Sequence, residues 1–526
     1  MGGDRAVTDE RDAELDADLL VVGGGIAGLV SAWTAAEAGR RVTVLEAAGH
    51  VGGPVAAHVL AGLEMDAGTE SFATRGGRVE PLLAELGLAD RVVEPNPVGA
   101  WVGYRYQGRF AASRLPRTGM LGIPGDLDEH GTAYGELVEA IGAEGARAAR
   151  RDLTLPPTVG VDATDPGATT IGALVEARMG RAVIDRLVAP VAGGIYSGDP
   201  YEMPAESVAH GLLSALVEVG TLSGAVRHLQ AQRAPGSAVR GLVGGMHTLT
   251  DRLRDRIVAA GGRILLHREV DGIERTAEGW RVRVAAVGDR PSSGSPMSPG
   301  VCDPGSQTCH TASQLVLATT ADPALRLLEL SEAGPWAHPA AVALVTLVVD
   351  DARLDVEPRG TGMLVTADAP DVQAKAMTHA SAKWRWIADA AASGHPGRHV
   401  LRLSYGRAGQ PSTMADDELC AQAVRDVRVL TDVDIADRAV AATAVHRWLN
   451  VQPSARADEI RQRVDAAAAN LRDLAVVGSW RSGTGLASVL PYAREQTLRL
   501  LAHPERPRNG TSGASTADTT YEEVAK

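Results

Sequence analysis

Short runs of apolar residues separated by helical stretches are the clearest pattern near the start of the chain. The first run, residues 19–22, leads into a glycine-rich stretch at 23–28, a helical segment and a second apolar run at 42–45. Short apolar runs bounded by turn residues are typical of buried strands, and their alternation with helices predicts a parallel sheet. The chain therefore opens with a predicted strand–helix–strand unit.

The same pattern returns twice, far along the chain. A glycine pair and an amphipathic helix at 244–260 are followed by apolar or alternating runs at 263–266, 280–284 and 315–318. A last apolar run at 474–478 precedes a glycine turn and a final helix. We expect all these pieces to form one α/β, Rossmann-like domain that is assembled from discontinuous segments.

The remaining residues are expected to form an inserted α+β substrate domain, mainly helical at 76–230 and of mixed strands at 335–440. The Rossmann-like domain then takes 17–75, 231–334 and 441–503. A stretch at 288–312, rich in Pro, Ser and Gly, is predicted to be an enlarged hairpin loop. The polar ends, 1–16 and 504–526, are expected to be disordered.

Composition narrows the class of protein. The chain has 526 residues, 45% of them hydrophobic and 22% charged, and a net charge of −13. This length predicts at least two domains, and the acidic balance argues against nucleic acid and anionic membranes as partners. No apolar run reaches the roughly 18 residues needed to span a bilayer, and no signal-peptide core is present, so a cytoplasmic location is expected.

The three cysteines, Cys302, Cys309 and Cys420, fit no metal-binding spacing and no disulfide framework. No metal site is therefore expected. Cys302 and Cys309 both fall in the predicted loop, where they are either a redox pair or incidental cysteines.

The glycine-rich turn carries the chemistry of a dinucleotide site. Gly23 allows a tight turn, Gly25 lets the backbone approach a pyrophosphate, and Gly28 lets the helix pack closely on the strand. Free N–H groups at the helix start face the phosphates, where the helix dipole favours negative charge. The predicted cofactor-binding residues of this turn are Gly23, Gly24, Gly25, Ile26, Ala27 and Gly28.

Two later features define the dinucleotide site further, and the second of them favours FAD over NAD. Glu46 ends the second predicted strand, 18 residues after Gly28, where a carboxylate can accept hydrogen bonds from ribose hydroxyls. The pair Gly52-Gly53 follows and brings the backbone close to the ligand again, which an NAD site does not require.

A second glycine turn, Gly483-Thr484-Gly485, opens the last predicted helix and supports FAD independently. N–H groups at such a helix start can lie near a flavin ring, where reduction develops negative charge. The alternative interpretation is an ordinary strand-to-helix turn.

Several longer stretches, taken in order, resemble one family over nearly the whole chain. They are the residues 62–72, Leu115-Pro116 with 122–124, the turn at 193–200, Thr378 with Lys383-Trp384, and 402–406. In this order they resemble the protoporphyrinogen and coproporphyrinogen oxidases, the FAD-dependent porphyrinogen oxidases of the flavin amine oxidase superfamily. The resemblance is to the soluble, Gram-positive type.

This resemblance implies non-covalently bound FAD and a further set of contacts to it. The implied residues are Ala47, Gly52 and Gly53 near the phosphates; Ala67, Gly68, Thr69 and Glu70 along the flavin; Val270 near the adenine; Trp448 beside the flavin; and Thr484, Gly485 and Leu486 at its ring.

The resemblance also implies an activity in heme biosynthesis, the oxidation of coproporphyrinogen III to coproporphyrin III. Six electrons would pass through FAD to oxygen, so no catalytic side chain is expected, and ferrochelatase is implied as a downstream partner. Because the substrate carries propionates, arginines beside the family-like stretches are substrate-binding candidates, with solvated surface charge as the alternative. These candidates are Arg75, Arg109, Arg114 and Arg117.

Two departures from the family pattern keep alternatives open. Pro54 stands where the superfamily usually has Arg or Lys, and residues 454–459 replace a common Pro-Gln-Tyr and Gly-His stretch. The alternatives are a protoporphyrinogen IX oxidase, a flavin amine oxidase, and a non-enzymatic flavin-binding paralogue.

Overall fold

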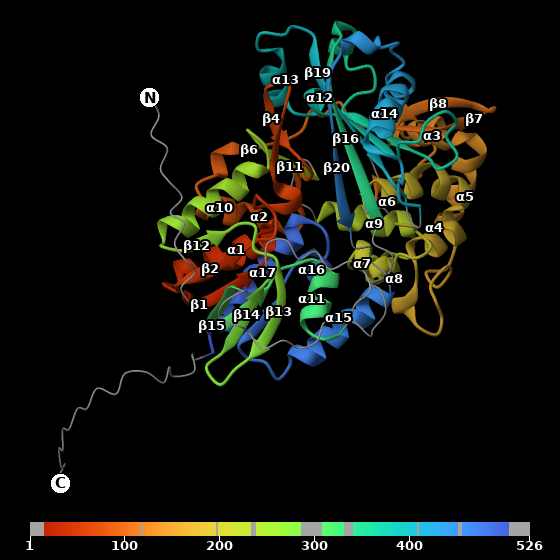
Figure 1. Cartoon of the computed structure of the whole chain (residues 1–526). Coiled ribbons are helices and arrows are strands. Elements are labelled where there is room, and N and C mark those ends of the chain that lie inside the picture. The colour runs from red at the N-terminus through yellow and green to blue at the C-terminus, as the bar shows by residue number, and fades with distance from the viewer. Residues whose placement is uncertain are drawn as a thin grey trace, which may run out of the picture.

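The computed structural model describes residues 15–116, 119–195, 198–232, 238–285, 308–330, 340–407, 410–450 and 455–503. Two large sheets and a group of helices make up the molecule (Figure 1). Cys302, most of the predicted loop 288–312 and nearly all of the two ends expected to be disordered lie outside the described residues. The first strand begins at Leu15, so residues 15 and 16 belong to it.

The first sheet is seven-stranded and has the order β12-β2-β1-β15-β14-β13, with β21 paired to β15. β1 lies inside it, parallel to both β2 and β15, and β21 is parallel to β15. Strands from both halves of the chain thus form one Rossmann-like sheet, as the sequence predicts. Its strands are β1 (Leu15–Val22), β2 (Val42–Leu45), β12 (Arg263–Leu265), β13 (Val270–Arg275), β14 (Trp280–Val284), β15 (Thr308–Leu317) and β21 (Leu474–Val476).

Helices cover both faces of this sheet. Apolar side chains of α1 (Ile26–Glu37), α10 (His247–Ala259) and α17 (Leu486–Leu501) form the core on one face, together with α2 (Val79–Glu85). The other face is covered by α11 (Ala321–Leu327) and α15 (Ala455–Ala468). Every position of β2 is buried, which explains why it reads as a continuous apolar run.

The second sheet is also seven-stranded, in the order β20-β16-β19-β18-β17-β7-β8. All neighbours are antiparallel except β17 and β7. Helix α14 (Asp416–Thr431) covers one face, and α12 (Ala380–Lys383) and α13 (Arg385–Ala392) lie at the other. The strands are β7 (Trp101–Tyr106), β8 (Arg109–Arg114), β16 (Ala340–Asp350), β17 (Gly362–Val365), β18 (Ala376–His379), β19 (Arg398–Tyr405) and β20 (Val440–Asn450).

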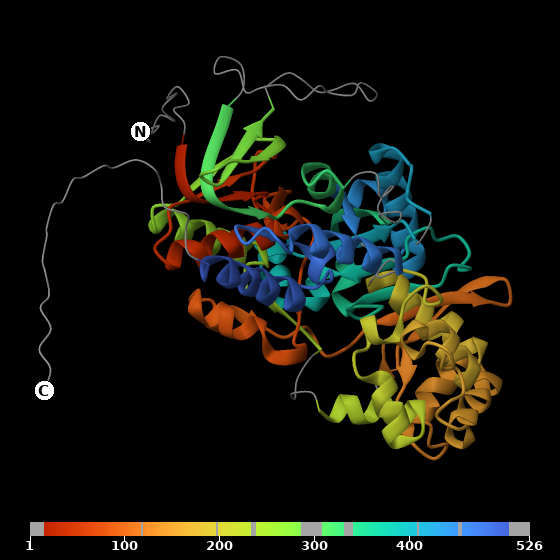
Figure 2. The same ribbon diagram turned by 90° about the horizontal axis from the view of Figure 1, so that it is seen from below.

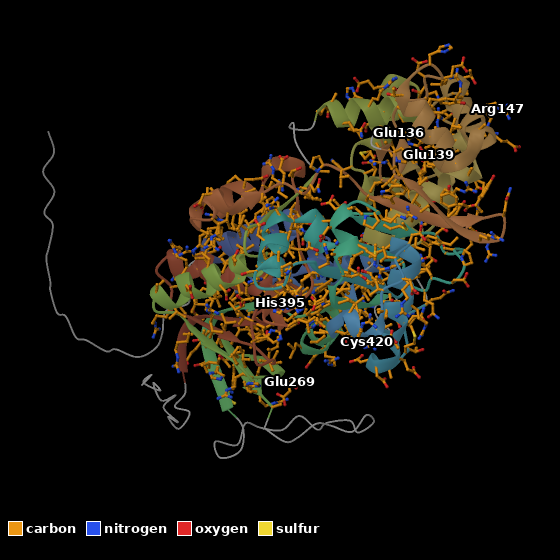
Figure 3. All side chains as sticks on the ribbon, turned by 90° about the horizontal axis from the view of Figure 1, so that it is seen from above. Glu136, Glu139, Arg147, Glu269, His395 and Cys420 are labelled. Atoms are coloured by element: carbon orange, nitrogen blue, oxygen red, sulfur yellow. The ribbon has the colours of Figure 1, made fainter. Side chains whose placement is uncertain are left out.

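Helices of the inserted stretch form a separate core at one end of the molecule (Figure 2). Figure 3 shows Glu136, Glu139 and Arg147 of α3 on the opposite side of the molecule from Glu269, which precedes β13. The helices are α3 (Thr132–Ala149), α4 (Ile171–Met179), α5 (Arg181–Val183), α6 (Ala189–Ile195), α7 (Ala205–Val208), α8 (Leu212–Val219) and α9 (Leu222–Ala231).

Short strands connect these parts. The hairpin of β3 (Ala57–Leu60) and β4 (Leu63–Asp66) packs between the two sheets, with Met65 in a core shared with Val400 and Trp384. The other short strands are β5 (Phe72–Ala73), β6 (Val92–Val93), β9 (Gly119–Met120), β10 (Ile123–Pro124) and β11 (Val239–Leu242).

The structure differs from the expected segment boundaries in four places. β7 and β8 are strands of the second sheet inside the stretch expected to be mainly helical, and β20 belongs to that sheet although 441–503 was assigned to the Rossmann-like domain. Helix α2 packs in the Rossmann-like core rather than in the substrate domain. β15 begins at Thr308, so Cys309 lies in a strand instead of the predicted loop.

Candidate functional site

The turn between β1 and α1 has the geometry of a phosphate-binding loop. Gly23 has a φ of 104°, and a Cβ at Gly28 would lie 1.9 Å from the carbonyl oxygen of Gly23, so both positions require glycine. A Cβ at Gly25 would meet nothing within 4 Å. Gly25 precedes the first turn of α1, and no side chain caps the helix there. The bare N–H groups of α1 therefore face open space that an anion can fill.

Glu46 lies directly beside this turn at the end of β2. Its Oε2 accepts a hydrogen bond from the Gly24 N–H at 2.6 Å, and its Oε1 accepts one from the Ala48 N–H at 2.7 Å. The N–H of Arg268 donates to the Glu46 carbonyl oxygen, which brings the chain leading to Val270 next to the carboxylate. A carboxylate has about four acceptor sites, so lone pairs remain for a ligand's hydroxyls.

Gly52 and Gly53 come back to the same turn. The Gly52 N–H donates to the Gly24 carbonyl oxygen at 2.8 Å, and both glycines have positive φ, 102° and 55°. Pro54 follows in a 3₁₀ turn and accepts a hydrogen bond from the Thr69 N–H at 2.7 Å. Pro54 thus anchors the 67–70 segment through its carbonyl oxygen, a role that does not need a basic side chain.

The 67–70 segment is enclosed by the second sheet. Arg402 on β19 donates to the Gly68 carbonyl oxygen at 2.7 Å and to the Glu70 carboxylate at 2.9 Å, and Lys383 at the end of α12 pairs with the same carboxylate. Burial opposes ionisation of Glu70, but the charges of Lys383 and Arg402 outweigh it and lower the pKa of its carboxyl. Glu70 therefore stays charged and joins the two sheets.

Three stacked rings lie next to this segment. His58 on β3 stacks on His446 of β20 with ring centroids 4.6 Å apart, and Trp448 stacks on His446 at 6.0 Å. Trp448 donates from Nε1 to the Ala67 carbonyl oxygen at 3.4 Å. Burial, followed by the charges of His446 and Arg402, lowers the pKa of His58 to about 4, so its ring is neutral at neutral pH.

The C-terminal turn adds a second bare helix start. α17 begins after Gly485, no side chain caps it, and a Cβ at Gly485 would meet nothing within 4 Å. Thr484 is exposed, and Leu486 is buried against α1 in the Rossmann-like core. Because β1 and β21 flank β15 in parallel, the helix starts of α1 and α17 lie at the same edge of the sheet.

The structure thus brings nearly all predicted cofactor residues to one edge of the first sheet, where it meets the second. Sequence reasoning missed the roles of His58 and His446, which no spacing signalled. Arg402 and Lys383 were seen only as parts of family-like stretches, because their partner Glu70 is more than 300 positions away.

The structure describes the side chains of two of the four candidate arginines. Arg109 and Arg114 are both exposed on β8, and the Arg114 guanidinium lies 5.6 Å from the Trp101 ring centroid. Arg75 begins a 3₁₀ turn after β5, but its side chain lies outside the described residues, as does all of Arg117. These assignments stay predictions.

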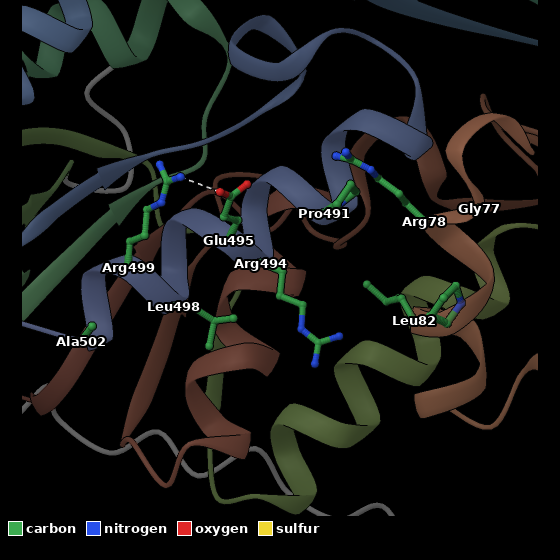
Figure 4. Close-up of a pocket in the computed structure, with 10 residues that line it drawn as sticks. Gly77, Arg78, Leu82, Pro491, Arg494, Glu495, Leu498, Arg499 and Ala502 are labelled. Carbon is green, nitrogen blue, oxygen red and sulfur yellow. Dashed lines mark hydrogen bonds and ion pairs between the residues drawn. The ribbon is translucent and has the colours of Figure 1, made fainter.

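A surface pocket of about 630 Å³ lies elsewhere, between the start of α2 and the part of α17 from Pro491 onward (Figure 4). Its lining contains none of the predicted cofactor residues, so it is separate from the glycine turns. In the part of the chain that the structure covers, no three His, Cys, Asp or Glu side chains are grouped to hold a metal ion. No described helix has the length and apolar character to cross a membrane.

Comparisons with known proteins agree with this geometry. The family described as flavin containing amine oxidoreductase matches residues 26–491. A coproporphyrinogen III oxidase of Mycobacterium leprae is 29% identical over 92% of this chain and 98% of that protein. One of Mycobacterium tuberculosis is 30% identical over 90% of this chain and 95% of that protein.

A solved structure from Exiguobacterium sp. 255-15, provisionally described as a protoporphyrinogen oxidase, has the same fold. It covers 94% of this chain and 100% of its own with a TM-score of 0.71 at 21% identity. The family match and the full-length relatives together settle the classification. The chain belongs to the flavin-containing amine oxidoreductases and, within them, to the coproporphyrinogen III oxidases.

Proposed function

We propose that this protein oxidises coproporphyrinogen III to coproporphyrin III in heme biosynthesis, with FAD as cofactor and oxygen as electron acceptor. The observation that carries the proposal is the match to coproporphyrinogen III oxidases over at least nine-tenths of both chains. A cytoplasmic location and a downstream ferrochelatase are parts of the same proposal.

The residues present fit FAD. The open space at Gly25 suits a pyrophosphate, Glu46 suits a ribose, and the start of α17 suits the electron-rich side of a flavin ring. Bound FAD supplies two-electron acceptance, and three rounds of it convert a porphyrinogen to a porphyrin. The Ala67–Gly68 backbone and Trp448 are proposed to lie along the flavin.

The protein itself has to orient the flavin and the substrate and to enclose them. Arg402 and Trp448 fix the carbonyl oxygens of Gly68 and Ala67, so the segment proposed to face the flavin is held from the second sheet. The uncharged ring of His58 beside this segment favours a substrate whose reacting carbons are themselves apolar. No charged acid–base pair is required at that point.

Anaerobic mixing with chemically reduced porphyrinogens tests the function. Coproporphyrinogen III is expected to bleach the flavin absorption band, and readmitted oxygen should restore it with about three peroxides per porphyrin formed. Faster bleaching by protoporphyrinogen IX would overturn the substrate assignment. Bleaching by putrescine or polyamines alone would instead identify an amine oxidase.

Acid precipitation tests the mode of cofactor attachment. We propose non-covalent FAD, so the supernatant should contain all the flavin and chromatography should identify it as FAD rather than FMN. A pellet that stays yellow would contradict the proposal.

Arg75, Arg109, Arg114 and Arg117 remain proposed carboxylate contacts. Arg75→Ala is expected to lower kcat/KM by about tenfold or more at unchanged flavin content, since a charge-assisted hydrogen bond contributes roughly 1.5–3 kcal/mol. An unchanged kcat/KM would place Arg75 outside the substrate site.

A further inference from the structure

One face of the second sheet runs from the proposed flavin to the helical part. His446, Leu344, Ser404, Ala376 and Leu364 are successive partners across β20, β16, β19, β18 and β17. Directly opposed residues share a face, so these five side chains lie in one row. Four strand intervals of about 4.8 Å separate the ends of the row by about 19 Å.

The two ends of this row have different neighbours. At the β20 end, His446 stacks between His58 and Trp448, beside the 67–70 segment. At the β17 end, Leu364 packs against α6, where a Cβ at Gly194 would lie 2.6 Å from its side chain. The residues between them on β19 and β18 are small, Ser404 and Ala376. A flat macrocycle that reaches the flavin along this face would extend towards α6.

Arg407 lies at the α6 end. It follows β19, and its Nη2 donates to the carbonyl oxygens of Val365 and Thr366 at 3.1 and 3.4 Å, immediately after Leu364. Its Nη1 is 4.0 Å from the point where a Cβ of Gly193 would stand. Within the described residues, Nη1 and Nε of Arg407 donate to no protein group. Nη2 of the guanidinium is therefore anchored, and Nη1 is open towards α6.

No described carboxylate neutralises Arg407. Asp368, near it in the chain, accepts instead from the hydroxyl of Thr366 at 2.7 Å. Burial lowers the pKa of Arg407, and burial together with the charge of Arg407 lowers the pKa of Lys375 to about 8. Half-buried Arg407 and buried Lys375 thus repel each other here, and an anion would relieve both the repulsion and the desolvation of Arg407.

We propose that Arg407 binds a carboxylate of the porphyrinogen through its free Nη1 and so orients the macrocycle towards the flavin. This assignment rests on the proposed function. It makes Arg407 a substrate-binding residue and predicts that the protein discriminates among porphyrins by their peripheral carboxylates.

Binding of the product isolates this role from turnover. Coproporphyrin III and its tetramethyl ester, which lacks free carboxylates, are titrated into the flavin-loaded protein while porphyrin fluorescence is followed. Arg407→Gln keeps an amide that can donate to Val365 but removes the charge. Arg385→Gln is the matched control, because the Arg385 side chain is 86% exposed on α13 and pairs only with Asp389 in the described part of the chain.

We expect Arg407→Gln to weaken coproporphyrin III binding by about tenfold or more, with little change for the ester and with flavin content and melting temperature retained. Arg407→Lys, which keeps the charge without the planar fork, should bind with intermediate affinity. Should Arg407→Gln fail to fold, the lysine variant decides: affinity equal to wild type would overturn the proposal, and weakened affinity for the acid but not the ester would support it.

Turnover separates this proposal from the function on which it rests. If the wild type oxidises coproporphyrinogen III and Arg407→Gln binds coproporphyrin III as tightly as Arg385→Gln, the carboxylate site is wrong and the function stands. If the wild type binds coproporphyrin III through Arg407 but oxidises no porphyrinogen, the function is wrong and the site stands. If the wild type binds no porphyrin, both are rejected.

Discussion

Arg402 donates from Nη2 to the carbonyl oxygen of Gly68 at 2.7 Å, across 334 positions of the chain. The same guanidinium pairs with Glu70, which also holds Lys383. These contacts fix the segment proposed to face the flavin from the side of the second sheet. The position of that segment therefore depends on how the two sheets are docked.

Glu70→Gln should destabilise the protein, because it leaves Lys383 and Arg402 buried with their main counter-charge removed. The exposed fractions of the three side chains are only 16%, 18% and 6%, so we expect a loss of roughly 3 kcal/mol in the free energy of unfolding. Urea titration followed by circular dichroism measures it. The control is Glu495→Gln, whose exposed pair with Arg499 should contribute less than about 1 kcal/mol. Equal losses of unfolding free energy in the two variants would contradict a buried ion-pair network of Glu70, Lys383 and Arg402.

Gly25→Val should yield folded protein without flavin. The φ of −68° and ψ of 175° at Gly25 are open to any residue, and a Cβ there meets no protein atom, so the added side chain obstructs only the ligand. Gly28→Val should behave differently, since its Cβ would clash with the Gly23 carbonyl oxygen and lower the melting temperature. Flavin-to-protein absorbance ratios and thermal melts distinguish the two. Full flavin occupancy in Gly25→Val would reject the pyrophosphate assignment.

Glu46→Ala should weaken FAD binding by about tenfold or more, because it removes an acceptor for ribose and frees the N–H groups of Gly24 and Ala48. Glu46→Gln keeps one acceptor oxygen and is expected to lose less. Titration of FAD into apoprotein measures both. A lower melting temperature with unaltered FAD affinity would mean that Glu46 only stabilises the glycine-rich turn and does not bind FAD.

His58 should make stability depend on pH below neutrality. Its pKa is about 4 in the folded protein and 6.5 ordinarily, so between these values the unfolded chain takes up a proton that the folded chain does not. The free energy of unfolding therefore falls as the pH drops from 6.5 towards 4. Allowing for partial solvent access to the ring, we expect a contribution on the order of 1–2 kcal/mol.

His58→Phe keeps a ring against His446 and removes the proton site. Urea midpoints of this variant should fall less between pH 7.5 and pH 5 than those of the wild type. His395→Phe, a change at an exposed histidine, should track the wild type, and buried His379 titrates alike in all three proteins. Parallel midpoint curves for wild type and His58→Phe would show that His58 does not contribute.

The part of the site that the sequence predicts is local. Gly25 and Glu46 could be assigned because the strand, turn, helix and acid that define their roles lie within 32 residues, counted from 15 to 46. The hydrogen bond from Arg402 to Gly68 could not be predicted, because it depends on sheet pairing and on the orientation of two domains. The residues of β20 were assigned to the Rossmann-like domain rather than to the second sheet for the same reason: the neighbour β16 is remote in sequence.

Arg407 illustrates a second limit of prediction from the sequence. In a chain whose positive charges are almost all arginine, composition makes one arginine look like another. Only its lower exposure, and the absence of a described carboxylate beside it, set Arg407 apart from the exposed Arg109 and Arg114.

The strand order of the first sheet also constrains when the protein can fold during its synthesis. β1 obtains its neighbour β15 only after about 300 residues, and Arg494 of α17 reaches Glu85 across 409 positions. At a typical 5–20 residues per second, the apolar strand β1 waits roughly 25–95 s for the last helix of its domain to be synthesised. Such long-range pairing slows folding and leaves an unpaired strand edge exposed meanwhile. We therefore expect nascent chains truncated before residue 474 to aggregate unless a chaperone holds them, whereas the complete chain can close its own sheet.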